Sequence, residues 1–196
     1  MIRTSVTKLD ALHLYQQGVI ELDDLIKRLR GETVETEAMQ FARAFHKLLE
    51  KIDEIEEGKD AEIDGNVFSA SDILLIKNNL KYKPALGVPE IKNVKEYNVD
   101  GEIVEVSAVA DLLVGETVVE YKTTRYFDIE KYINSYQWRF YMDIFGASKA
   151  VYNIFVFYNN QLREVIDFTV YNYKGLQDDI KFMLRDYVKL CNLIEL

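Results

Sequence analysis

Helical spacing of apolar residues dominates the first 85 positions of the chain. Over residues 36–55 apolar side chains recur every three or four positions and form the seam of a buried helix face: Phe41, Phe45, Leu48, Ile52 and Ile55. Further helices are predicted over residues 7–17, 22–30 and about 70–80, ended or capped by Gly18, Gly31 and either Ser69 or Ser71.

Strand-like alternation follows this helical segment. It predicts strands over residues 88–99, 102–113, 117–123, 150–158 and 163–173. Asp100-Gly101 and Gly115-Glu116 provide tight turns, and a glycine in the first central position suits type II′. One long helix is predicted over 128–145, ended by Gly146, and a last helix over 175–194.

A meander of strands followed by strand–helix–strand predicts an α/β (α+β) fold with a mixed central sheet flanked by helices. No internal repeat or low-complexity linker divides the chain. We therefore expect a single domain over residues 1–196. It comprises a helical front end (1–85), a core (86–158), and a C-terminal strand and helix (159–196).

Composition narrows the class of protein. The 196 residues are 48% hydrophobic, with 2 Pro and 9 Gly, which excludes a disordered or collagen-like chain. No apolar run approaches the roughly 18 residues of a membrane span, and the N-terminus has no signal-peptide pattern. The single cysteine, Cys191, excludes an internal disulfide and an iron–sulfur cluster. We expect a cytoplasmic protein that does not enter a membrane.

The net charge of −9 taken alone argues against a nucleic-acid protein. The charge is uneven, because residues 50–64 hold 8 acids and 2 bases. The simplest interpretation of that stretch is a solvated helix end and loop. An acidic surface that mimics DNA or docks a basic protein is the alternative.

Two carboxylates are expected to meet on the central hairpin. If Gly115-Glu116 forms the turn, Val114 pairs with Thr117 and Asp111 falls opposite Glu120. Because strand residues alternate faces, Glu120 and Lys122 point the same way. In the simpler interpretation, Asp111 and Lys122 lie at a solvated edge of the sheet and form only an ion pair with each other. A buried site would instead suit a divalent cation, since Mg²⁺ accepts one or two carboxylates together with water and phosphate oxygens.

Two predicted helices carry further candidates. His46 lies at the edge of the apolar face of residues 36–55, where it is either a core histidine or a neutral metal ligand. Gln137 and Tyr141 are four residues apart and share a helix face. Trp138 and Phe140 on the same helix are interpreted as core residues.

Taken in order, these residues resemble the PD-(D/E)xK nuclease superfamily, and within it the RecB-like nucleases. The matching motifs are, in chain order, Arg43 to His46 followed by Glu50, Pro89-Glu90, Ala108 to Asp111, Glu120-Tyr121-Lys122 with Thr123-Thr124, and Gln137 to Tyr141. Each motif alone is weakly specific, and together they span most of residues 5–158. The resemblance implies a restriction-endonuclease-like core, which agrees with the pattern of elements.

The resemblance also implies roles for individual residues. His46, Glu90, Asp111, Glu120 and the carbonyl of Tyr121 would hold one or two Mg²⁺ or Mn²⁺ ions. Lys122 would assist attack of water on a phosphodiester, and Gln137 and Tyr141 would orient the substrate strand or the lysine. We expect substrate contacts from four further residues, namely Arg43, Thr123, Arg125 and Arg139.

Three departures from the family pattern matter. Arg43 stands where the family has a small residue before the histidine, and Ala108 replaces the family glycine. Cys191 alone cannot supply the four cysteines of the cluster-bearing branches. The resemblance is therefore to a cluster-free, phage-type exonuclease.

The resulting hypothesis is a metal-dependent deoxyribonuclease. It would be an exonuclease that processes DNA ends in recombination, repair or replication, with DNA as its partner. The alternative is an inactive or structure-specific nuclease-fold module that binds DNA or a recombination partner such as a single-strand annealing protein. The sequence leaves open whether the protein forms a homo-oligomer, the polarity of digestion, and DNA against RNA.

Overall fold

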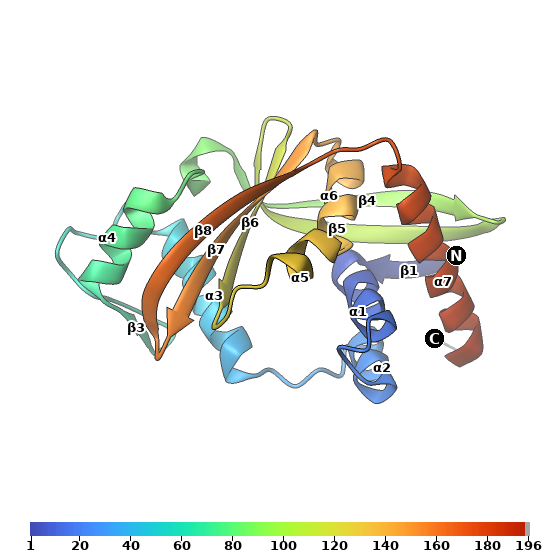
Figure 1. Cartoon of the computed structure of the whole chain (residues 1–196), viewed down its shortest axis with the longest axis horizontal. Coiled ribbons are helices and arrows are strands. Elements are labelled where there is room, and N and C mark those ends of the chain that lie inside the picture. The colour runs from blue at the N-terminus through green and yellow to red at the C-terminus, as the bar shows by residue number, and fades with distance from the viewer. Residues whose placement is uncertain (195–196) are drawn as a thin grey trace.

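A mixed sheet forms the centre of the computed structural model, which describes residues 1–194 (Figure 1). Its six strands are β1 (Ile2–Ser5), β4 (Val88–Val99), β5 (Glu102–Val114), β6 (Thr117–Thr124), β7 (Lys149–Tyr158) and β8 (Gln161–Tyr171). The order is β1-β5-β6-β7-β8, with β4 on the other edge of β5. β1 pairs with β5 and β6 pairs with β7 in parallel, and the remaining pairs are antiparallel.

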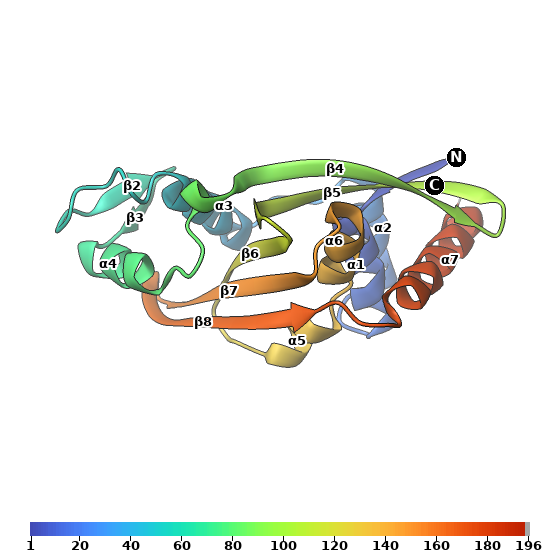
Figure 2. The ribbon, with the colours of Figure 1, turned by 90° about the horizontal axis from the view of Figure 1, so that it is seen from above.

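Helices cover both faces of this sheet. They are α1 (Val6–Gln16), α2 (Leu22–Arg30), α3 (Glu37–Glu50), α4 (Ala70–Asn79), α5 (Ile129–Asn134), α6 (Gln137–Phe145) and α7 (Leu176–Ile194), with a short turn η1 (Pro84–Leu86). α1, α2, α6 and α7 bury the first core, and α3 and α4 bury the second (Figure 2). The predicted fold class, a mixed sheet flanked by helices, is confirmed.

Local signals in the sequence account for most element boundaries. The side chains of Ser5, Thr36 and Ser69 accept backbone N–H groups at the starts of α1, α3 and α4. Gly31 and Gly146 end α2 and α6 in the left-handed conformation. The helix predicted over 36–55 is too long, since α3 ends at Glu50. Ile52 is nevertheless buried in the second core from the turn that follows.

Two strand pairs fall outside the predictions. β1 lies where no strand is predicted, and it pairs in parallel with β5 from Ile2↔Val104 to Ser5↔Ser107. The second is the short hairpin of β2 (Ala61–Ile63) and β3 (Asn66–Phe68), joined at Asp64-Gly65 with both residues at positive φ. This hairpin extends from the acidic stretch 50–64, which therefore is not wholly a loop.

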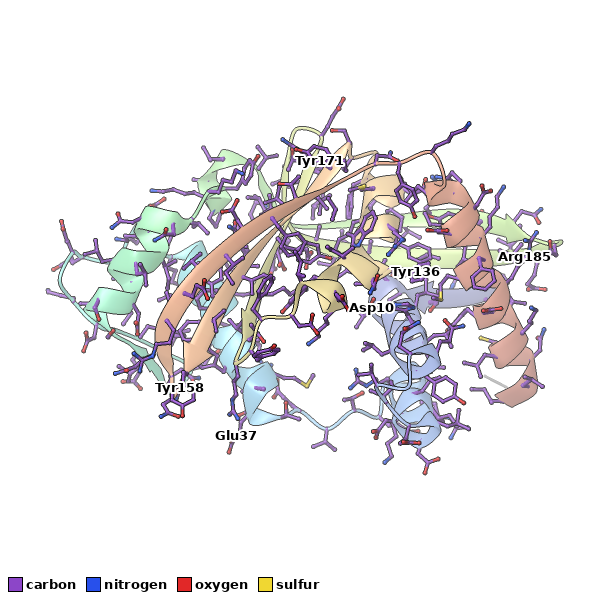
Figure 3. All side chains as sticks on the ribbon, viewed as in Figure 1. Asp10, Glu37, Tyr136, Tyr158, Tyr171 and Arg185 are labelled. Atoms are coloured by element: carbon purple, nitrogen blue, oxygen red, sulfur yellow. The ribbon has the colours of Figure 1, made fainter. Side chains whose placement is uncertain are left out.

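The long helix predicted over 128–145 is wrong, because the chain breaks between α5 and α6 at Ser135. The carboxylate of Asp10, on α1, accepts a hydrogen bond from Ser135 Oγ at 2.7 Å and another from the Tyr136 N–H at 3.0 Å. Asp10 and Tyr136 are labelled side by side in Figure 3. Asp10, which is distant in sequence, thus accepts hydrogen bonds from the Ser135 hydroxyl and from the Tyr136 N–H, and the helix is interrupted at this point.

Replacement of Asp10 with alanine should destabilise the protein. Hydrogen bonds to a charged group contribute about 1.5–3 kcal/mol each, and less where they are only partly buried, as here. We therefore expect a loss of about 2–4 kcal/mol and a melting temperature lower by about 4–16 °C. Thermal unfolding followed by circular dichroism measures the effect. Asp24→Ala, at an exposed position on α2, is the matched control. Equal melting temperatures for the two variants would contradict a stabilising role of the Asp10 hydrogen bonds at the break between α5 and α6.

Candidate active site

Strands β5 and β6 separate where Asp111 and Glu120 face each other. The predicted register is confirmed, with Val114 paired to Thr117 across Gly115-Glu116 and the ladder running to Leu112↔Val119. Beyond that pair, the backbone N–H groups of Asp111 and Tyr121 face side-chain oxygens instead of the backbone of the neighbouring strand. The Tyr121 N–H donates to Asp111 Oδ2 at 2.8 Å, and the Asp111 N–H points to Glu120 Oε1 at 3.4 Å. The carboxylates therefore occupy the fork between the strands.

The backbone is distorted at this fork. Val104, Val106, Ala108 and Ala110 pack in the first core, yet Leu112 packs in the second, so the alternation of β5 shifts at Asp111. Glu90 lies opposite, between the pairs Pro89↔Leu112 and Ile91↔Ala110, with φ +45°. A left-handed residue in a strand is strained. Glu90 is exposed, and its charge contributes to the raised pKa of Asp111, so it belongs to the same charged group.

Lys122 contacts the more deeply buried carboxylate. Its Nζ lies 2.7 Å from Glu120 Oε2, and the side chain of Glu120 is only 2% exposed. Burial, and then the charge of Asp111, raise the pKa of Glu120 to about 7. Burial alone would lower the pKa of Lys122, but the charges of Glu120 and Asp111 outweigh it and raise the pKa. The ammonium of Lys122 thus contacts Glu120 and interacts electrostatically with both carboxylates.

His46 of α3 closes the open side of the fork. Its Nε2 lies 3.1 Å from the Tyr121 carbonyl oxygen and its Nδ1 lies 3.4 Å from Asp111 Oδ1. Burial, and then the charge of Lys122, lower the pKa of His46, so the ring is neutral at pH 7. His46 is therefore brought to the two acids, with its lone pair available for a proton or a cation.

Gln137 and Tyr141 of α6 act through the backbone of β5. Gln137 Nε2 donates to the Tyr141 hydroxyl at 2.9 Å, and that hydroxyl donates to the Val109 carbonyl at 2.7 Å. This chain of bonds fixes the segment that leads into Asp111. In this structure the two residues position the carboxylate.

The remaining expected substrate contacts divide into three groups. Arg43 is exposed on the same side of α3 as His46 and pairs with Glu35. Thr123 and Arg125 line a neighbouring cleft. The expectation that Arg139 contacts substrate is corrected. Its guanidinium donates to the carbonyls of Ile133, Asn134 and Ser135 and stacks on Trp138. With those donors used to cap α5, Arg139 has a structural role.

The donor set suits a hard divalent cation. Asp111, Glu120, Glu90 and the Tyr121 carbonyl offer oxygens, and His46 offers a neutral nitrogen, all of which Mg²⁺ or Mn²⁺ accepts. Across residues 1–194, however, three or more histidine, cysteine or acidic side chains nowhere converge in the arrangement that a metal ion needs. In the structure Asp111 Oδ2 is turned to the Tyr121 amide and Glu120 Oε2 to Lys122.

Tyr152 is a neighbour that the sequence pattern conceals. It pairs with Glu120 in the β6–β7 register, and its buried hydroxyl lacks a hydrogen-bond partner among the described residues. Burial, and then the charge of Glu120, raise its pKa well above the usual value. Because Tyr152 stands in an apolar strand, no sequence signal separates it from ordinary core residues.

Similarity to known proteins is confined to three-dimensional structure. No protein-family model and no curated protein matches the chain. The solved structure of SSO0001 matches with a TM-score of 0.58 and 15% identity over 97% of this chain and 77% of that one. A protein described as an exonuclease from Eubacterium rectale matches with a TM-score of 0.56 and 14% identity, over 94% and 78%.

A third match is the alkaline exonuclease LHK-Exo from Laribacter hongkongensis. Its complex with dAMP aligns with a TM-score of 0.53 and 13% identity, over 97% of this chain and 88% of that one. At such low identity these likenesses concern the fold. The chain has the mixed α/β fold found in solved exonucleases.

Proposed function

We propose that this protein is a metal-dependent nuclease that hydrolyses phosphodiester bonds of DNA. The observation that carries the proposal is the fork of β5 and β6, where Asp111 and Glu120 lie together and the ammonium of Lys122 contacts Glu120. Like charges placed side by side destabilise a fold, so such a pair indicates a site that is built for a ligand. The neighbouring solved exonucleases support the same reaction class.

The chain's own groups have separable tasks in this reaction. Asp111, Glu120, Glu90, His46 and the Tyr121 carbonyl would hold one or two Mg²⁺ or Mn²⁺ ions. A bound ion supplies charge neutralisation and acidification of water. Lys122 Nζ would donate to the attacking water or to a phosphate oxygen, where positive charge stabilises the transition state. Gln137 and Tyr141 hold Asp111 in place through Val109.

An exonuclease that processes DNA ends is the activity we favour. The fold matches include a protein described as an exonuclease and an alkaline exonuclease crystallised with dAMP. A role in phage-type recombination or repair, a single-strand annealing partner and a homo-oligomer remain proposals of the sequence. No helix among residues 1–194 is both long enough and apolar enough to cross a membrane.

The direct test incubates the purified protein with labelled linear duplex and with closed circular DNA, in Mg²⁺, Mn²⁺ or EDTA. We expect mononucleotide release from linear DNA with either metal, slow attack on closed circles, and none of this in EDTA. Equal degradation of circles and ends would overturn the exonuclease proposal. Absence of hydrolysis with any metal would leave the alternative of a binding module, which titration calorimetry with Mn²⁺ would separate by whether the metal binds.

A further inference from the structure

A polar cleft of about 590 Å³ lies directly beside the fork. Its walls are the start of α3 (residues 37–42), the end of β6 and the residues after it (123–125), the β7–β8 turn (157–160), and Asn66. The two acids of the fork and Lys122 are outside it. The cleft is thus distinct from the fork, and two of the expected substrate contacts, Thr123 and Arg125, line it.

The cleft is continuous with the fork along two elements. Thr124, which lines the cleft, lies two residues beyond Lys122 on the same face of β6, about 7 Å along the strand. Ala42 precedes His46 by four residues on α3, or about 6 Å along a helix. The elements that carry Lys122 and His46 therefore also line the cleft.

The lining is suited to bases more than to phosphates. Phe41 and Phe157 form the floor, in edge-to-face contact at 4.9 Å between ring centroids. Tyr158 stands at the rim with 59% of its surface exposed, and Asn159 and Asn160 follow it. Aromatic rings bind nucleobases by stacking without regard to sequence, and amides can meet base edges.

The backbone that carries Tyr158 is held in a tight hairpin turn. Tyr158 pairs with Gln161 at the end of the β7–β8 hairpin, and Asn159 and Asn160 both have positive φ, as a type I′ turn requires. The backbone at Tyr158 therefore loses little conformational freedom on binding. Figure 3 shows Tyr158 and Glu37, which both line the cleft, near each other at the same end of the molecule.

Charge in the cleft is nearly balanced. Arg125 and Glu37 are its only charged lining residues, and within residues 1–194 Arg125 forms no ion pair. One cation can contact one phosphate. This matches a protein of net charge −9 that cannot hold nucleic acid by bulk attraction.

We propose that this cleft binds a short stretch of single-stranded nucleic acid and delivers it to the fork. Tyr158 stacks on a base, Arg125 contacts one phosphate, and Phe41 and Phe157 form the floor. The volume suits a small part of one strand. In a duplex the bases are paired and stacked on one another, so none is free to stack on Tyr158. This inference rests on the proposed function, because it names the form of substrate that the same site receives.

The test measures binding of fluorescein-labelled oligothymidine, oligouridine and a blunt duplex to the full chain in EDTA, by fluorescence anisotropy. We expect both single strands to bind more tightly than the duplex, and the better of the two identifies the natural strand. Tyr158→Ala should weaken single-strand binding about 5–150-fold, the range of one base–aromatic stack. Arg125→Ala should lower the slope of log affinity against log salt by about 0.7.

Tyr171→Ala and Arg30→Ala are the matched controls, since both positions are exposed and outside the cleft lining. Wild-type affinity in Tyr158→Ala, or tighter binding of the duplex, would overturn the assignment of the cleft. Either result would leave the nuclease proposal standing if linear DNA is still degraded with Mn²⁺. Conversely, loss of binding in Tyr158→Ala together with no hydrolysis by the wild type would support the cleft and overturn the nuclease proposal.

Discussion

Asp111→Asn should greatly reduce hydrolysis without harming the fold, and it should raise the stability of the metal-free protein. The asparagine oxygen can still accept the Tyr121 N–H, and its amide can still face His46, so both neighbouring contacts persist. What disappears is one of two negative charges at the fork. We expect nuclease activity to fall by about 10³-fold, as when a group that stabilises the transition state is removed.

The rise in stability follows from the sign of the pKa shifts. Burial raises the pKa of Asp111, and the charge of Glu90 raises it further. The pKa of Glu120 is raised from 4.5 to about 7 by burial and by the charge of Asp111. An acid whose pKa is raised by folding destabilises the native state as pH rises through that window. Removal of Asp111 should therefore stabilise by about 1 kcal/mol at pH 8, or 2–4 °C, and by nothing near pH 4.

Melting curves in EDTA at pH 8 and pH 5, beside activity with Mn²⁺, measure both halves of this prediction. Glu116→Gln is the control, because Glu116 is an exposed acid in the turn of the same hairpin. The Mn²⁺-induced rise in melting temperature should be lost in Asp111→Asn and kept in Glu116→Gln. Full activity in Asp111→Asn would remove Asp111 from the mechanism.

The contacts that the sequence predicted well are local ones. The β5–β6 hairpin is fixed by Gly115, whose φ of +56° the turn requires, and the register follows by counting outward. Gln137 and Tyr141 meet because residues four apart share a helix face. The long buried helix of His46 was recognisable from its apolar seam, although its last turn was not.

The contacts that the sequence missed join distant segments. β1 is four residues long, too short to show a period, and its partner lies about a hundred residues away. Asp10 breaks the helix expected over 128–145 from another element. Arg139 looked like a phosphate ligand because sequence shows a charge but not the carbonyls that already use it. The shift of alternation at Asp111 likewise lies opposite the positive φ of Glu90, on another strand.

Lys122→Ala is the second variant with a large expected effect, and it should harm both activity and stability. It removes the only ammonium within residues 1–194 that contacts Glu120, and it leaves two carboxylates in the fork. Loss of one partner of a buried pair costs about 3 kcal/mol or somewhat more, which corresponds to about 6–12 °C at this chain length. We expect nuclease activity with Mn²⁺ to fall about 10²–10³-fold.

The pH dependence separates this cause from simple loss of packing. Without Lys122 the pKa of Glu120 rises further, so the variant should be nearly as stable as the wild type at pH 5 and lose stability as pH rises through about 7. Lys122→Met, which keeps an apolar stem, should show the same pH trend, whereas Lys92→Ala, an exposed lysine on β4, should show none. If the deficit of Lys122→Ala were equal at pH 5 and pH 8, the lysine would act as a packing residue. The charge pairing at the fork, and with it the case for a nuclease site there, would then lose its physical basis.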